Sequence, residues 1–177
     1  VVVNCAGMVW QRAGPLSDKE VFEVNAVAPH AIARSCDAIG AKLVHVSSDG
    51  VFSGKKGNYH EQGLPDPVDR YGESKLRGEI HSAPHLTLRT AVIGWQIVGT
   101  YGLAEWFLSN TGQRVYGWKK TFFSGITSYA LADSLAIVLR DYPELTGVFH
   151  VGSSRISKYQ ALELLNENLS RPVELVS

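Results

Sequence analysis

A tyrosine and a lysine lie four residues apart in the stretch RYGESKLRGE, which runs from Arg70 to Glu79. In a helix this spacing places Tyr71 and Lys75 one above the other on the same face. A tyrosine hydroxyl titrates near ~10, and a nearby ammonium group favours the phenolate and lowers that pKa. The pair is therefore predicted to give or take a proton close to neutral pH, as acid–base catalysis requires.

A serine is placed to complete such a site. Ser48 ends the apolar run KLVHVSS, which predicts a strand. At the end of a strand its hydroxyl could enter the same crevice and, together with Tyr71, hold one carbonyl oxygen and polarise its carbon toward hydride attack. A second Tyr-x-x-x-Lys match, Tyr116 and Lys120, lies among Gly and Trp with no predicted helix, and is assigned to ordinary packing.

Strand-like and helix-like runs alternate along the 177 residues. Strands are predicted at Val1–Val3, Lys42–Ser48, Leu86–Gly94 and Gly147–Gly152. Helices are predicted from Ser17, from Pro29 to about Gly40, around Tyr71, near Leu103–Ser109, from Thr127 or Ser128 to about Arg140, and after Ser157. This alternation predicts an α/β fold with a parallel sheet covered by helices on both faces. Ligands bind beyond the carboxyl ends of such strands, which directs attention to Asn4–Gly7, Ser47–Gly50 and Ala91–Gly94.

The composition excludes several function classes. The chain has 17 Lys and Arg and 17 Asp and Glu, so its formal net charge is zero. A protein whose main partner is nucleic acid needs a surplus of basic residues, so this balance argues against such a partner. No apolar run approaches the ~20 residues that span a bilayer, so no membrane segment is expected. The two cysteines lack metal-type spacing and are interpreted as reduced thiols, so the protein is predicted to be cytoplasmic. The six histidines lack metal-ligand spacing, and no metal is predicted. Arg89, inside a predicted strand, is expected to pair with an acidic side chain. The chain begins without Met in an apparently buried strand, so an N-terminal portion is expected to be missing.

Taken together, these motifs resemble the extended short-chain dehydrogenase/reductase family, and most closely its dTDP-4-dehydrorhamnose reductase branch of sugar-nucleotide reductases. The similarity runs through VVNCAG, VNAVAPHAIARSCDAIGAKLVHVSSDGVFSG, PVDRYGESKLRGE, LTLRTAVIG and GVFHVGSSRISKYQAL. The resemblance implies a Rossmann-type parallel sheet with helices on both faces and a small C-terminal substrate-binding part. It implies a truncated dinucleotide-binding core with the catalytic helix over residues 1–94, and a mixed substrate-binding part over residues 95–177 that includes a returning strand at 147–152.

The resemblance also implies roles for individual residues. Tyr71 would protonate the substrate oxygen, Lys75 would lower the pKa of that tyrosine and bind the nicotinamide ribose, and Ser48 would hold the carbonyl. Besides Tyr71 and Lys75, the cofactor, NADP(H) or NAD(H), would be contacted by Asn4, Ala6, Gly7, Asn25, Ser47, Ala91, Val92 and Ile93. The substrate side would comprise Ser48, Asp49 and Trp106. Three of these residues also fit simpler roles: Asn4 as a turn residue, Gly7 as a glycine of positive φ, and Asn25 as a helix-surface amide.

The activity implied is NAD(P)H-dependent reduction of a 4-keto-6-deoxy sugar nucleotide for cell-surface polysaccharide precursors, with a homodimer as a further expectation. Gly50 stands where the rhamnose-type enzymes carry tyrosine, and Val92 where they often carry tryptophan, so the sugar stays open. The motif Gly-x-Gly-x-x-Gly is missing from the chain, so the choice between NADH and NADPH stays open. Because Asp49 is followed by Gly50 and not by a second carboxylate, a dehydratase is disfavoured. Two alternatives remain: a sugar-nucleotide epimerase, and a non-catalytic regulatory subunit that binds a dinucleotide.

Overall fold

The computed structural model describes residues 1–9, 17–96, 102–170 and 172–176. The chain forms two compact units. The first comprises Val1–Thr90 and Ser134–Val151, and the second comprises Ala91–Asp133 and Gly152–Ser177. The chain therefore leaves the first unit after Thr90, and the strand predicted at residues 147–152 returns to it.

The first unit is built on a four-stranded sheet in which every neighbouring pair is parallel, as predicted. Its order is β1 (Val2–Asn4), β2 (Leu43–Val46), β3 (Leu86–Arg89) and β8 (Gly147–His150). The expectation of a buried first strand is wrong, because Val1, Val2 and Val3 are 72 %, 37 % and 39 % exposed. The reason is that β1 lies at the edge of the sheet, with β2 as its neighbour.

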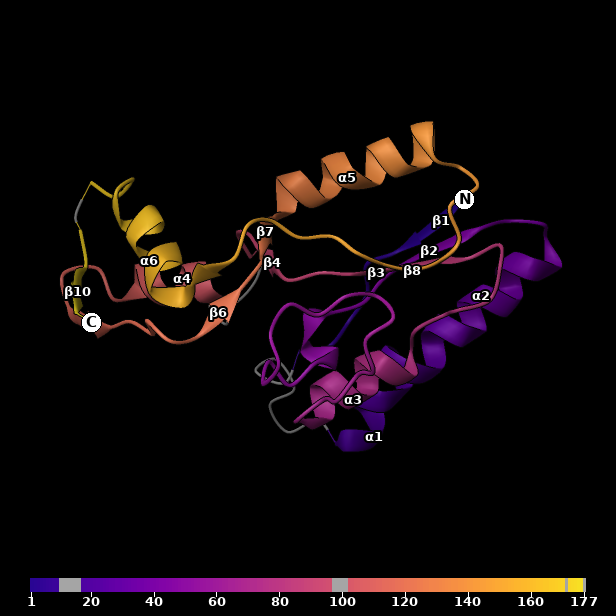
Figure 1. The fold of residues 1–177 in the computed structure, drawn as a ribbon, viewed down its shortest axis with the longest axis horizontal. Coiled ribbons are helices and arrows are strands. Elements are labelled where there is room, and N and C mark those ends of the chain that lie inside the picture. The colour runs from indigo at the N-terminus through magenta and orange to yellow at the C-terminus, as the bar shows by residue number, and fades with distance from the viewer. Residues whose placement is uncertain (10–16, 97–101, 171, 177) are drawn as a thin grey trace. The chain divides into compact units, whose positions relative to one another are not determined.

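Helices cover both faces of this sheet (Figure 1). One face carries α1 (Asp18–Phe22), η2 (Glu23–Val27), α2 (Ala28–Ala38) and α3 (Arg70–Arg77), and the other carries the second half of α5 (Ser128–Asp141). Successive strand residues point to opposite faces. Accordingly Leu43 packs with Cys36 of α2, whereas Val44 packs with a cluster that includes Leu135 and Val138 of α5.

Local sequence signals explain where several helices begin. Ser17 and Glu20 form the predicted capping box, with the Ser17 amide donating to Glu20 Oε2 at 2.8 Å. Pro29 lies in the first turn of α2, where a missing amide hydrogen costs nothing. The two predicted helices are continuous. The π-helical turn η2 joins them, and Asn25 lies within that turn.

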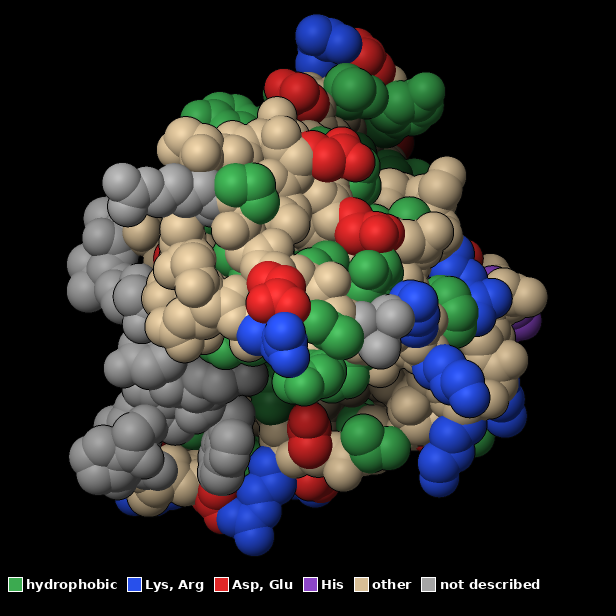
Figure 2. Space-filling model, turned by 90° about the vertical axis from the view of Figure 1, so that its left-hand side faces the viewer, with side chains coloured by type: hydrophobic (Ala, Val, Ile, Leu, Met, Phe, Trp, Pro, Cys, Tyr) green, Lys and Arg blue, Asp and Glu red, His purple; other side chains and the backbone are tan. Residues whose placement is uncertain are grey.

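Among its described residues, the second unit contains α4 (Leu103–Ser109), α6 (Lys158–Asn166), the first part of α5 and three strand pairs. The pairs are β4 (Val92–Ile93) with β7 (Ile126–Thr127), β5 (Arg114–Tyr116) with β10 (Glu174–Val176), and β6 (Phe122–Phe123) with β9 (Ile156–Ser157). The strand predicted over Leu86–Gly94 is therefore two strands. The hydrophobic core of the second unit includes the cluster of Phe107, Leu162, Val115 and Val173. Apolar side chains also reach the surface in several places on the face seen in Figure 2.

Candidate active site

Tyr71 and Lys75 occupy successive turns on one face of α3, as their spacing predicted. The helix begins after Asp69, whose Oδ1 accepts a hydrogen bond from the Gly72 amide at 2.7 Å. This cap satisfies an amide that the first helical turn leaves without a partner. Lys75 is only 3 % exposed and Tyr71 is half-buried. Lys75 therefore lies in the interior of the first unit, and Tyr71 lies partly covered one turn before it.

Two glycines allow α3 to approach the backbone of its neighbours closely. A Cβ atom at Gly72 would overlap the carbonyl oxygen of Gly50, and one at Gly78 would overlap the carbonyl oxygen of Asn25. Neither position can accept a larger residue unless the helix moves. The glycines thus hold Tyr71 near the segment that follows β2.

Ser48 lies in that segment and caps the 3₁₀ helix η3 (Asp49–Val51). Its Oγ accepts a hydrogen bond from the Gly50 amide at 3.1 Å, which orients the side chain. The Ser48 hydroxyl lies close enough to the Tyr71 side chain to lower the pKa of its phenol. A Cβ atom at Gly50 would lie 3.3 Å from Ser48 Oγ and 3.5 Å from Cε1 of Tyr71. The structure therefore brings together the two hydroxyls that the sequence paired, with Gly50 beside both.

The Lys75 ammonium group lies between the end of β2 and the loop that follows β1. Nζ donates a hydrogen bond to the Val46 carbonyl oxygen at 2.9 Å, and a Cβ atom at Gly7 would lie 3.5 Å from Nζ. Burial lowers the pKa of Lys75 to about 8, although Glu79 and Cys5 act to raise it. The group is therefore still largely protonated at neutral pH.

The pKa of Tyr71 moves in the direction opposite to the prediction. Burial raises it above 10.0, the hydrogen bond with Ser48 offsets part of the rise, and the charges of Asp49 and Asp69 add to it. The charge of Lys75 does not offset this rise. The expectation of an acidified phenol is therefore wrong for this structure, and Tyr71 keeps its proton at neutral pH.

Two asparagines shape the loop after β1. Asn4 Oδ1 accepts a hydrogen bond from the Ala6 amide at 3.0 Å. Asn25 is fully buried, and its side chain accepts from the Met8 amide at 2.7 Å and donates to the Met8 carbonyl oxygen at 2.8 Å. The same amide group of Asn25 donates to Ser74 Oγ at 3.0 Å and so ties the loop to α3. Asn25 is thus a buried amide that holds the loop against α3, and not a helix-surface amide. The predicted contacts of this loop with a cofactor stay predictions.

A buried group of three polar side chains lies beside the site. It consists of Ser47, Glu79 and Arg89, of which the last two were not predicted to belong to the site. Ser47 Oγ donates to Oε1 of Glu79 at 2.9 Å, so this hydroxyl is used inside the protein. Its predicted part in lining the nicotinamide pocket stays a prediction. Glu79 is also the expected acidic partner of Arg89, which donates to both of its oxygens. The position of Glu79, four residues after Lys75, is the signal that could have marked it.

The remaining predicted site residues are Asp49, Ala91, Val92, Ile93 and Trp106. Asp49 is exposed and begins η3, and the Ser48 hydroxyl donates to its Oδ1 at a long 3.5 Å. Ala91, Val92 and Ile93 belong to the second unit, where the last two form β4. Trp106 lies on α4 in the same unit, packs against the Phe107 cluster, and has its ring centroid 5.5 Å from that of Trp118. Their predicted contacts with a cofactor or substrate stay predictions.

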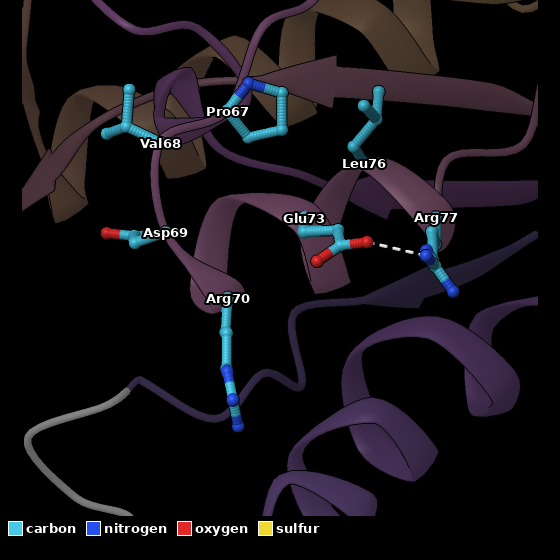
Figure 3. Close-up of a pocket in the computed structure, with 7 residues that line it drawn as sticks. All are labelled: Pro67, Val68, Asp69, Arg70, Glu73, Leu76 and Arg77. Carbon is cyan, nitrogen blue, oxygen red and sulfur yellow. Dashed lines mark hydrogen bonds and ion pairs between the residues drawn. The ribbon is translucent and has the colours of Figure 1, made fainter.

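A surface hollow lies on the outer side of α3, separate from these groups. It has a volume of about 510 Å³ and is lined by Pro67, Val68, Asp69, Arg70, Glu73, Leu76 and Arg77 (Figure 3). Exposed charged side chains border it, and Glu73 and Arg77 form an ion pair there. Within the described ranges, no set of three or more His, Cys, Asp or Glu side chains is arranged to hold a metal ion. None of the helices that the structure describes is long and apolar enough to cross a bilayer.

Comparison with known proteins decides the family. The sequence model of the RmlD substrate binding domain matches residues 1–176. The chain belongs to the RmlD substrate-binding domain family. The predicted relationship to the dTDP-4-dehydrorhamnose reductase branch is thereby confirmed, and the RmlD match runs through both compact units.

The curated relatives include two kinds of protein, a methionine adenosyltransferase subunit and a reductase. Methionine adenosyltransferase 2 subunit beta of Bos taurus is 28% identical over 175 residues, which cover 90% of this chain and 52% of that protein. dTDP-4-dehydrorhamnose reductase of Mycobacterium tuberculosis (strain ATCC 25618 / H37Rv) is 37% identical over 84 residues, which cover 45% of this chain and 28% of that protein. At most, the chain spans about half the length of these curated relatives.

A solved structure shows the shared fold. The crystal structure of dTDP-4-dehydrorhamnose reductase from Bacillus anthracis str. Ames, in complex with NADP, matches with a TM-score of 0.84 and 21% sequence identity. The match covers 98% of this chain and 64% of that chain. The α/β fold predicted from the alternation of strands and helices is that of the RmlD-type proteins.

Proposed function

We propose that the complete protein reduces the keto group of a 4-keto-6-deoxy sugar nucleotide, with NADPH or NADH as the reductant. The observation that carries the proposal is that the Ser48 hydroxyl and the Tyr71 ring both lie beside Gly50, one helical turn from the buried Lys75. Membership of the RmlD family and the reductase relative from Mycobacterium tuberculosis support the substrate class. The NADP in the Bacillus anthracis enzyme supports the cofactor.

The residues around Lys75 fit a nicotinamide cofactor. An ammonium group has three N–H donors, and the Val46 carbonyl oxygen uses one of those on Lys75. A buried cation with further donors suits a ribose hydroxyl. Gly7 lies near Nζ in the loop held by Asn25, where the lack of a side chain allows a ligand to come close to the backbone. A cofactor bound there would supply the hydride.

The protein groups would act on the carbonyl oxygen of the substrate. The hydroxyls of Ser48 and Tyr71 both donate to this oxygen and draw electron density from the carbon that is reduced. As negative charge develops on the oxygen, Tyr71 transfers its phenolic proton to it. The high pKa of the free phenol keeps that proton in place at neutral pH until the reaction needs it. The Ser48 hydroxyl, which lowers the pKa of Tyr71, then stabilises the phenolate that remains.

The test uses the complete protein with a nucleotide-linked 4-keto-6-deoxy sugar and NADPH or NADH. We expect oxidation of the reduced cofactor in a one-to-one ratio with the appearance of a hydroxyl group on the sugar. Epimerised sugar without net consumption of cofactor would contradict the reductase and indicate the epimerase. Absence of turnover with sugar nucleotides of several bases would also contradict it.

A second candidate function is that of a regulatory subunit. The relatives named methionine adenosyltransferase 2 subunit beta align over 90% of this chain, a larger share than the 45% covered by the reductase relative. On this candidate the complete protein associates with an adenosyltransferase and does not turn over sugar nucleotides. Size-exclusion chromatography with a purified adenosyltransferase from the same organism would show a joint peak. Separate elution together with reductase turnover would exclude it.

A further inference from the structure

Three buried polar side chains lie next to the candidate active site without a part in its proposed chemistry. Ser47, Glu79 and Arg89 are 4 %, 3 % and 4 % exposed, and we call them the Ser47–Glu79–Arg89 cluster. Arg89 donates from Nε to Oε1 of Glu79 and from Nη2 to Oε2, both at 2.7 Å. Ser47 Oγ donates to the same Oε1 at 2.9 Å. A bidentate pair of this kind is strongly directional, so it holds its members in one geometry.

The cluster attaches the end of α3 to the end of β2 at a second point. The first point is the hydrogen bond from Lys75 Nζ to the Val46 carbonyl oxygen, and the second is the bond from Ser47 Oγ to Glu79. Val46, the last residue of β2, and Ser47, the residue after it, are thus bound by Lys75 on α3 and by Glu79, which lies two residues beyond the end of α3. Two such contacts fix the rotation of the helix on the strand as well as its distance. Ser48 is the next residue along the chain.

Arg89 also contacts the far side of the segment that contains Ser48. Its Cζ lies 5.0 Å from the ring centroid of Phe52, which follows η3 directly. The arginine itself is held in β3, next to β2 in the sheet, and the Ser47 amide donates to the Leu88 carbonyl oxygen at 2.7 Å. Through Glu79 and Ser47 on one side and Phe52 on the other, Arg89 therefore holds the chain on both flanks of Ser48.

We propose that Glu79 and Arg89 are positioning residues that set where the Ser48 hydroxyl stands against Tyr71, an inference that rests on the proposed function. They act through Ser47 and Phe52 and touch neither substrate nor cofactor. Catalytic geometry tolerates little error, since a displacement of ~1 Å can cost on the order of 10²-fold in rate. The cluster supplies the rigidity that such a limit requires.

The test compares two variants that each remove one buried hydroxyl from the complete protein. Ser47→Ala breaks the connection to Glu79. Thr87→Val is the matched control, because Thr87 is equally buried in β3 but its hydroxyl bonds to the backbone of Ile80. Two readouts are taken: kcat and KM for reduction, and the hydrogen-exchange rate of the Gly50 amide in the protein without ligands. That amide donates to Ser48 Oγ and so reports where the side chain stands.

We expect Ser47→Ala to lower kcat by about tenfold with little change in KM, and to speed exchange of the Gly50 amide by about tenfold. Ser47→Thr, which keeps a hydroxyl, should restore both values, and Thr87→Val should change neither. The inference is overturned if Ser47→Ala leaves Gly50 exchange unchanged, or if Thr87→Val changes kcat and exchange as much as Ser47→Ala does. If the unaltered protein shows no turnover, the proposed reductase fails, and the exchange comparison alone decides whether the cluster positions Ser48.

Discussion

Replacement of Lys75 by methionine should change how stability depends on pH. Lys75 is 3 % exposed, and burial lowers its pKa from 10.5 to about 8. Between these two values the unfolded chain holds a proton that the folded protein has lost. The unfolded state therefore binds more protons there, and stability rises with pH. A difference of about 2.5 pKa units, at 1.36 kcal/mol per unit, corresponds to a rise of about 3 kcal/mol between pH 8 and pH 10.5. Lys75→Met should lack that rise.

The assay is urea unfolding of the complete protein at several pH values from 7 to 10.5. Far-UV circular dichroism is a suitable probe, because it follows the loss of the helices of the first unit, in which Lys75 lies. Lys19→Met is the matched control, since its side chain is 83% exposed and should leave the pH dependence of the unaltered protein intact. Parallel stability curves for Lys75→Met and the unaltered protein would refute the reasoning, because they would mean that the ammonium group is not destabilised by burial.

Two further perturbations probe the surroundings of the site. His45 is fully buried, and burial is the main cause that lowers its pKa from 6.5 to about 3. The unfolded chain therefore binds a proton between these two pH values that the folded protein does not. This difference corresponds to about 5 kcal/mol of stability, which is present above pH 6.5 and is lost as the pH falls toward 3. His45→Gln should therefore flatten acid unfolding followed by circular dichroism, and an unchanged acid midpoint would count against a neutral buried imidazole. Gly72→Ala should destabilise the protein by ~1–3 kcal/mol, because its Cβ would overlap the Gly50 carbonyl oxygen. Gly50→Ala, whose Cβ meets its neighbours at 3.3 Å or more, should cost less in the same urea titration, and equal losses would contradict the close approach of α3.

Features that depend on local spacing could be predicted from the sequence. The pairing of Tyr71 with Lys75 follows from helical periodicity, and the capping box at Ser17 follows from the residue three positions later. The parallel sheet follows from the alternation of strand and helix patterns. The predicted strand over Lys42–Ser48 is shorter in the structure, where β2 ends at Val46, but Ser48 still lies just beyond the carboxyl end of that strand, where ligands bind in parallel sheets.

Features that depend on contacts between distant segments could not be predicted. The pKa of Tyr71 is set mainly by burial, which no spacing reveals, so the predicted lowering of that pKa was wrong. The use of the Ser47 hydroxyl by Glu79 joins residues 32 positions apart and depends on how α3 packs on the sheet. The strand predicted over Leu86–Gly94 divides because its last part pairs with β7 in the other unit, a partner more than 30 residues away in the sequence.

The most direct test of the central claim is the rate of substrate-dependent NADPH oxidation by Tyr71→Phe, with Tyr116→Phe as its control. Tyr116 begins the other Tyr-x-x-x-Lys match, ends β5 and is 66 % exposed, so the control removes an equivalent hydroxyl from a position with no partner serine strand. We expect Tyr71→Phe to keep the fold and lose about 10²–10⁴-fold in kcat, as removal of a general acid does, and Tyr116→Phe to keep full activity. Turnover by Tyr71→Phe at the unaltered rate would contradict the account, because the proton would then come from another group.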